Sequence, residues 1–133
     1  MPSPIPILGC RSVIDVLHHI TQGGPEWAYR HVTLWFPGPT NAWVVVYPLQ
    51  GTSEPYFDFM YTGTESPKAT LPWLLVKYPQ CEVVDWSPGR LACISASTTD
   101  IETLAQMIQD LAREAWGECG SLIKASYEPM VRA

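Results

Sequence analysis

The segment HVTLWFPGPTNAWVVVYP, residues 31–48, constrains the fold of this chain more than any other stretch. Two runs rich in β-branched and aromatic residues flank a break, PGPTN, whose proline and glycine residues are typical of a turn. This pattern predicts a β-hairpin with strands over residues 29–36 and 42–49. If the strands pair symmetrically about the break, Trp35 lies opposite Trp43.

This register divides the hairpin into two faces, because successive side chains of a strand point to opposite sides. One face is predicted to be apolar throughout, with Val32, Leu34, Phe36, Ala42, Val44 and Val46. The other face is predicted to carry His31, Thr33, Trp35, Trp43, Val45 and Tyr47. A sheet that faces water normally alternates apolar and polar residues, so the second face should also be covered. The cover is the chain's own short helix or tail, a second subunit, or a ligand; alternatively, the tryptophans close the core of a small sandwich.

Two helices are predicted from apolar residues at helical spacing, over residues 13–21 and 101–116. The apolar run at 71–78 fits a helix or a strand, and Thr70 as a cap with Pro72 in the first turn favours a short helix. Ser12 is expected to cap the first, with Asp15 in its first turn. Thr99 and Glu102 form a predicted capping box for the last, in which each side chain satisfies a free backbone amide.

Further strands are predicted over residues 56–61, 81–86 and 91–97, which gives the element order α-βββ-α-ββ-α. Strands grouped in meanders, with helices between and around them, predict an α+β fold with an antiparallel sheet of about five strands and helices packed on it. A chain of 133 residues fits one domain. We place that domain over residues 1–133, with a proline-rich lead at 1–11 and a weakly specified tail at 118–133.

Charge excludes several classes of partner. The net charge is −5, and the eight lysines and arginines are scattered, whereas nucleic acids and anionic membranes require a basic patch. The start, MPSPIPILGC, lacks the basic region of a signal peptide, and no apolar stretch is long enough to span a membrane. Four widely spaced cysteines without a CxxC motif then indicate reduced thiols and a cytoplasmic location.

No catalytic motif is present, since the chain lacks GxSxG, GxGxxG and a phosphate loop. Asp15, His18 and His19 lie on one predicted helix, which offers at most two metal ligands on a usable face. We therefore predict no catalytic residue, no metal and no cofactor. Cys119 is expected to be the thiol most open to reagents. Asp58 interrupts an aromatic strand, so one face there is expected to be wet, paired or at an edge, and we interpret Asp58 as an inward or edge-facing charge that prevents unwanted strand pairing.

The α-βββ-α-ββ-α order, the acidic pI near 5.0 and the mass of 14.9 kDa resemble those of the class I type III secretion chaperones and their chaperone-like relatives. The resemblance covers residues 12–117 and carries no sequence motif, so it assigns no functional residue. It implies a homodimer that presents apolar patches of a sheet to an extended segment of a partner protein, without a cofactor.

The sequence thus favours a non-enzymatic protein-binding module, an adaptor, secretion-type chaperone or inhibitor. Its predicted partner-binding residues are His31, Thr33, Trp35, Trp43 and Tyr47. An alternative is a ligand-pocket protein or small enzyme with an aromatic cavity between the sheet and the C-terminal helix. A third hypothesis is a metal-dependent protein built on His18, His19 or His31 and a cysteine.

Overall fold

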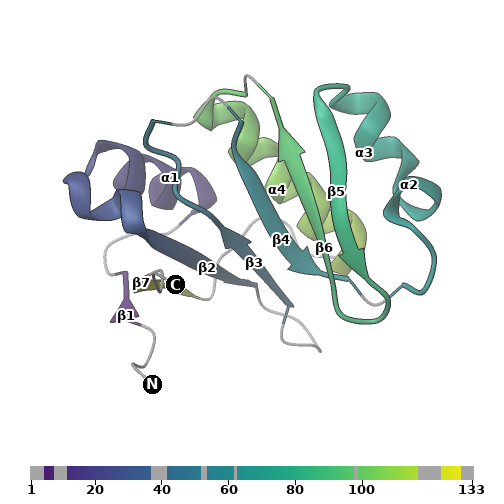
Figure 1. Ribbon diagram of the computed structural model, residues 1–133, viewed down its shortest axis with the longest axis horizontal. Coiled ribbons are helices and arrows are strands. Elements are labelled where there is room, and N and C mark those ends of the chain that lie inside the picture. Colours follow the sequence, from purple (N-terminus) through teal and green to yellow (C-terminus); the bar gives the residue numbers. More distant parts are fainter. Residues whose placement is uncertain are drawn as a thin grey trace.

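The computed structural model describes residues 5–7, 12–36, 42–51, 54–61, 63–97, 99–116 and 124–129. Within them, one antiparallel sheet holds seven strands in the order β1-β7-β2-β3-β4-β6-β5 (Figure 1). The strands are β1 (Ile5–Pro6), β2 (Arg30–Phe36), β3 (Ala42–Val46), β4 (Tyr56–Met60), β5 (Cys81–Ser87), β6 (Leu91–Ala96) and β7 (Lys124–Pro129). The helices are α1 (Val13–Gln22), α2 (Pro67–Thr70), α3 (Pro72–Lys77), α4 (Ile101–Trp116) and the 3-10 helix η1 (Pro25–Tyr29).

The predicted hairpin is confirmed, register included. Strands β2 and β3 pair with Trp35 opposite Trp43, and Val32 opposite Val46. The face predicted to be apolar is buried at every position, from Val32 on β2 to Val46 on β3. The mixed α and β composition and the antiparallel sheet are confirmed as well.

The predicted number of strands, about five, is wrong, because β1 and β7 add two. Strand β7 pairs with β2 along its whole length, from Arg30 opposite Pro129 to Trp35 opposite Lys124. Strand β1 in turn pairs with β7 through Ile5 and Pro6. The outer edge of β2 would otherwise leave a row of backbone hydrogen-bonding groups without partners, and β7 satisfies them.

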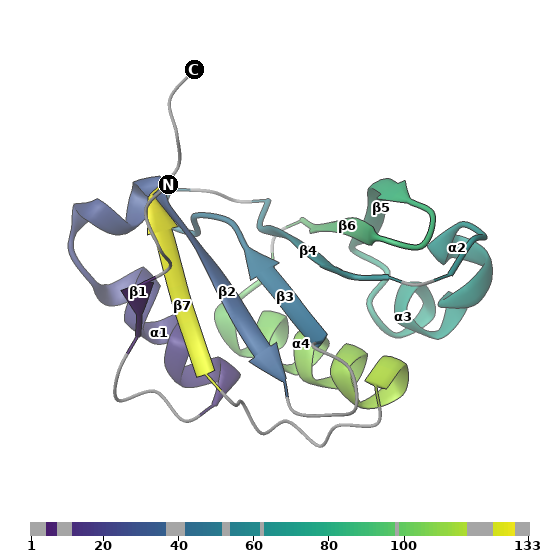
Figure 2. The same ribbon diagram turned by 90° about the horizontal axis from the view of Figure 1, so that it is seen from below.

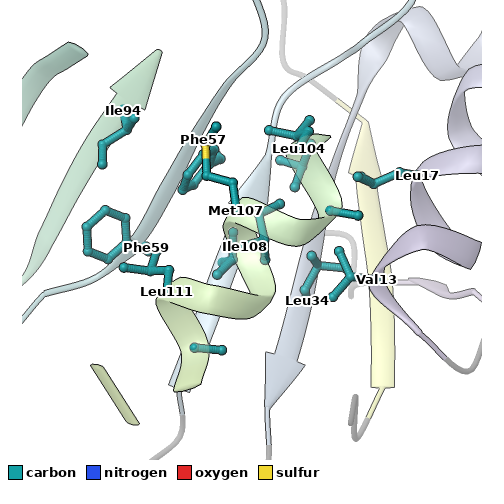
Figure 3. Packing of buried hydrophobic residues seen from close by; sticks show 14 of the residues in the cluster. Val13, Leu17, Leu34, Phe57, Phe59, Ile94, Leu104, Met107, Ile108 and Leu111 are labelled. Carbon is teal, nitrogen blue, oxygen red and sulfur yellow. The ribbon is translucent and has the colours of Figure 1, made fainter. Parts of the chain in front are cut away.

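Helices α1 and α4 pack together on the buried face of the sheet and form its core with the inward residues of β2, β3, β4 and β6 (Figures 2 and 3). Both helices are amphipathic, and their inward residues include Val13, Val16, Leu17, Leu104, Met107, Ile108 and Leu111, each no more than 2% exposed. The hydrophobic burial of these side chains fixes which face of the sheet the helices occupy.

The N-terminal cap of α1 is the residue predicted from the sequence, whereas that of α4 is a different residue. Ser12 Oγ accepts a hydrogen bond from the Asp15 amide at 3.2 Å, as predicted. At α4 the predicted cap, Thr99, is wrong by one residue. Asp100 Oδ1 accepts from the Thr103 amide at 2.7 Å and thereby caps the helix that begins at Ile101. A carboxylate is the stronger cap, and it also faces the positive end of the helix dipole.

The predicted short helix over residues 71–78 is confirmed as α3, which is tied to α4 by the buried carboxylate of Asp110. Tyr78 Oη and Lys77 Nζ both donate to Asp110 Oδ2 at 2.6 Å. From α4 itself, Gln106 Nε2 donates to Oδ1 at 2.8 Å, and Arg113 pairs with the same oxygen. Asp110 is 1% exposed, so these donors replace the water that it has lost.

Truncation of the inward leucines of α4 tests this packing. We expect Leu104→Ala and Leu111→Ala each to lower the free energy of unfolding by about 2–5 kcal/mol, because each leaves a cavity in a closely packed core. Urea denaturation followed by circular dichroism measures the loss. The exposed Glu114→Ala on the same helix is the control, with an expected change within about 0.5 kcal/mol. A loss below 1 kcal/mol at both leucines would contradict the packing described here.

The Asp110 cluster should make stability depend on acid pH. Burial by itself raises the pKa of Asp110, but the hydrogen bonds from Lys77, Tyr78 and Gln106 outweigh burial and hold the pKa at about 2. Because the folded-state pKa is depressed, the carboxylate stabilises the fold above its unfolded pKa of about 4 and loses this effect as the pH falls towards 2.

We expect Asp110→Asn to lower the free energy of unfolding by about 1–3 kcal/mol at pH 7. The unfolding free energies of the wild type and the variant should converge between about pH 4 and pH 2. Urea titrations at a series of pH values measure both. A difference that is the same at pH 7 and at pH 2 would show that the cost comes from packing and not from charge.

Candidate functional site

The face of the sheet opposite α1 and α4 is covered by none of the helices that the structure describes (Figure 2). Helix α3 was one predicted cover of this face. It contacts α4 instead, through Lys77 and Tyr78, and its Leu74 lies in the core. We call this uncovered side the open face. Its residues form three rows that run across the strands, one row for every second residue along each strand.

The first row, the tryptophan row, is apolar on β2, β3, β4 and β6. Trp35 on β2 lies opposite Trp43 on β3, and Met60 on β4 lies opposite Leu91 on β6. Both indole side chains are partly exposed. Trp35 Nε1 also donates to Ser126 Oγ on β7 at 3.4 Å, which fixes one ring relative to the sheet.

The second row, the Asp58 row, crosses the middle of the open face. It runs from Thr33 through Val45, Asp58 and Cys93 to Asp85, each opposite the next. Asp58 Oδ2 accepts a hydrogen bond from Tyr47 Oη at 2.6 Å. Burial, the hydrogen bond to Asp58 and the negative charges of Asp58 and Asp85 together raise the pKa of the Cys93 thiol to about 12.

The third row, the tyrosine row, is aromatic at its centre. The rings of Tyr47 and Tyr56 are stacked, with centroids 4.5 Å apart and planes at 20°. The ring of His31 lies 6.2 Å from that of Tyr47 in a tilted arrangement. Tyr56 is 41% exposed, and Ser95 and Glu82 continue the row on β6 and β5. Burial and the hydrogen bond to Asp58 raise the pKa of Tyr47, so its hydroxyl stays protonated and donates.

The structure brings all five predicted partner-binding residues together on the open face: His31, Thr33, Trp35, Trp43 and Tyr47. The sequence interpretation did not include Tyr56, Met60 and Cys93, although the alternation in YFDFM already places Tyr56, Asp58 and Met60 on one side of a strand. Of the positions predicted for Asp58, the edge of the sheet is wrong, whereas a paired carboxylate is what the structure has. Strand β4 lies between β3 and β6, and the Tyr47 hydroxyl satisfies the carboxylate there.

The three histidines make different contacts, that of His31 being with Tyr47. His19 packs edge-on against Trp27 on η1, with ring centroids 5.2 Å apart, and His18 pairs with Glu102 of α4 at 3.7 Å. Residues that the structure describes include no group of three His, Cys, Asp or Glu side chains arranged to hold a metal ion. Cys10 and Cys119 lie outside those residues.

The space between α4 and the sheet, where an aromatic ligand cavity was the alternative prediction, is filled by side chains. Phe57 and Phe59 of β4 meet Met107, Ile108 and Leu111 of α4 there (Figure 3). A depression does lie at the start of α4, between Thr21, Leu49, Pro55 and Leu104, without an aromatic residue in its lining. Of the aromatic side chains outside this core, Trp35, Trp43, Tyr47 and Tyr56 gather on the open face, whereas Trp73 lines a separate depression with Lys77 and Glu114.

Comparison with known protein families, with curated proteins and with solved structures finds no match for this chain. Within the described ranges, no helix is both long and apolar enough to cross a membrane. Function therefore has to be inferred from the side chains of the open face.

The thiols give a direct test of this environment. Burial raises the pKa of Cys81 to about 11, and that of Cys93 lies at about 12. At pH 8 we expect iodoacetamide to alkylate Cys93 about a hundredfold more slowly than free cysteine, because the thiolate is the reactive species. Cys119, predicted to be exposed, should react first. Peptide mass spectrometry assigns each rate, and the same reaction in urea is the control; rapid alkylation of native Cys93 would contradict its burial against Asp58.

Proposed function

We propose that this protein is a non-enzymatic binding module that holds a segment of another protein on the open face of its sheet. One observation carries the proposal: Trp35, Trp43, Tyr47 and Tyr56 gather on a face that no described helix covers. Adaptors, secretion-type chaperones and inhibitors are the kinds of protein that work in this way.

The chemistry of these side chains supports a protein partner. Tryptophan and tyrosine offer a large contact area with few rotatable bonds to immobilise, and each has a polar group at its edge. Residues of this kind dominate the binding energy of protein interfaces when they lie near the centre of the patch. Here the aromatic rows flank the central Asp58 row, so apolar contact area and hydrogen-bonding groups alternate across the face.

The cytoplasmic location predicted from the sequence is part of the proposal. The two cysteines within the described residues, Cys81 and Cys93, are buried and carry free thiols. Reduced thiols are the usual state in the cytoplasm. The homodimer also remains a prediction, and light scattering after size exclusion across a dilution series measures it.

Selection from a library of random peptides displayed on phage tests the function. The matched control is the double variant Trp35→Ser/Trp43→Ser, used for counter-selection. We expect peptides that bind the wild type and lose at least about tenfold in affinity for the variant, since aromatic anchors at the centre of an interface carry much of its energy.

The double variant must keep its fold for this comparison. Loss of the cross-strand tryptophan pair should lower the free energy of unfolding by only about 0.2–1 kcal/mol, with unchanged helix content by circular dichroism. Unfolding of the variant would instead assign both tryptophans to the core. Failure of the wild type to enrich any peptide over the variant would refute the proposed function.

A further inference from the structure

We infer that the segment held on the open face is extended and carries a basic residue, arginine or lysine, between two apolar residues at alternate positions. This inference rests on the proposed function and specifies the class of partner. The apolar residues would lie over the tryptophan row and the tyrosine row, and the basic residue over the Asp58 row between them.

The spacing of the three rows supports an extended segment. Trp43, Val45 and Tyr47 belong to successive rows and are separated by two residues each along the chain. Two residues of a strand span about 6.6–6.8 Å. Alternate side chains of an extended segment that runs parallel or antiparallel to β3 and β4 repeat at the same distance. Successive side chains on one face of a helix are about 5.4 Å apart and would fall out of step with the rows.

The charges support a basic residue at the middle position. Among the residues whose side chains are described, the register of the sheet places three charged ones on the open face. They are the carboxylates of Asp58, Asp85 and Glu82. By contrast, the cations of Arg30, Lys77 and Arg113 are engaged elsewhere. Arg30 lies over the rings of Trp27 and Tyr127, while the other two pair with Asp110. A chain with a net charge of −5 also attracts a basic segment at long range.

Asp58 retains the capacity to bind a cation. A carboxylate offers about four acceptor sites, and among the described residues the side chains of Tyr47 and Cys93 donate to Asp58. The stacked rings of Tyr47 and Tyr56 lie in the adjacent row, and a guanidinium or ammonium group is also attracted to the face of such a ring. Both the carboxylate and the rings therefore favour the same charge on the partner.

Three synthetic peptides of equal length test the inference: GSFSRSFSG, its glutamate counterpart GSFSESFSG, and the reordered GSRSFSFSG. Titration of each into ¹⁵N-labelled protein, followed by the indole N–H resonances of Trp35 and Trp43, gives the dissociation constants. We expect the first peptide to bind about tenfold more tightly than the second, because a charge-assisted hydrogen bond replaces a repulsion. It should also bind more tightly than the third, which has the same composition in the wrong order.

Two variants locate the effect. Asp58→Asn keeps an acceptor for Tyr47 and removes the charge, so it should weaken GSFSRSFSG about tenfold and leave GSFSESFSG unweakened. Asp85→Asn removes an exposed charge of the same row and provides the test if Asp58→Asn does not fold. Glu114→Gln on α4 removes one charge from the opposite side of the molecule and should change neither affinity. Higher salt should weaken the binding of GSFSRSFSG and should not weaken that of GSFSESFSG.

The outcomes separate this inference from the proposed function. Equal binding of the arginine and glutamate peptides, with loss of both in Trp35→Ser/Trp43→Ser, would overturn the inference and leave the proposed function standing. Equal binding of GSFSRSFSG and GSRSFSFSG would overturn the inferred order, in which the basic residue lies between the two apolar residues. Absence of any shift in the indole resonances at millimolar peptide would overturn the inference as well, and the phage selection would then decide on the proposed function alone.

Discussion

The packing of α1 and α4 against one face of the β2–β3 hairpin is the interaction on which the rest of the structure depends. It buries every residue on that face of the hairpin, all of them apolar, together with Phe57 and Phe59 of the next strand. Because side chains alternate strictly along a strand, this burial also determines which residues remain on the other side. The aromatic open face is thus the direct counterpart of the core, and a slip of one residue would exchange the two.

A carboxylate at the centre of a sheet requires compensation, and the open face provides it. Asp58 stands between Val45 and Cys93 in the middle of the sheet and accepts a hydrogen bond from the hydroxyl of Tyr47. The same hydrogen bond holds the Tyr47 ring parallel to that of Tyr56. The polar group therefore orders the aromatic side chains beside it. A face built in this way is already arranged before a partner arrives, which reduces the entropy lost on binding.

The hairpin and the composition of both of its faces could be predicted because they depend on local signals, a proline- and glycine-rich turn and a two-residue period. The cap of α4 was misplaced by one residue because Thr99 and Asp100 are both good capping residues and only the backbone decides between them. The strand β7 was missed because its partner, β2, lies about ninety residues away in the sequence, as the Trp35–Ser126 hydrogen bond shows. For the same reason the central position of β4, and hence the role of Asp58, does not follow from any local pattern.

The pairing of β7 with β2 has a consequence for the order of events during synthesis. Strand β2 is complete when residue 36 has been made, but its outer edge gains its partner only with residues 124–129. Until β7 has been made, the nascent chain therefore carries an open strand edge next to its most aromatic surface, the combination from which intermolecular association starts. Synthesis of β7 closes that edge, so protection of the edge depends on a segment made about ninety residues after β2.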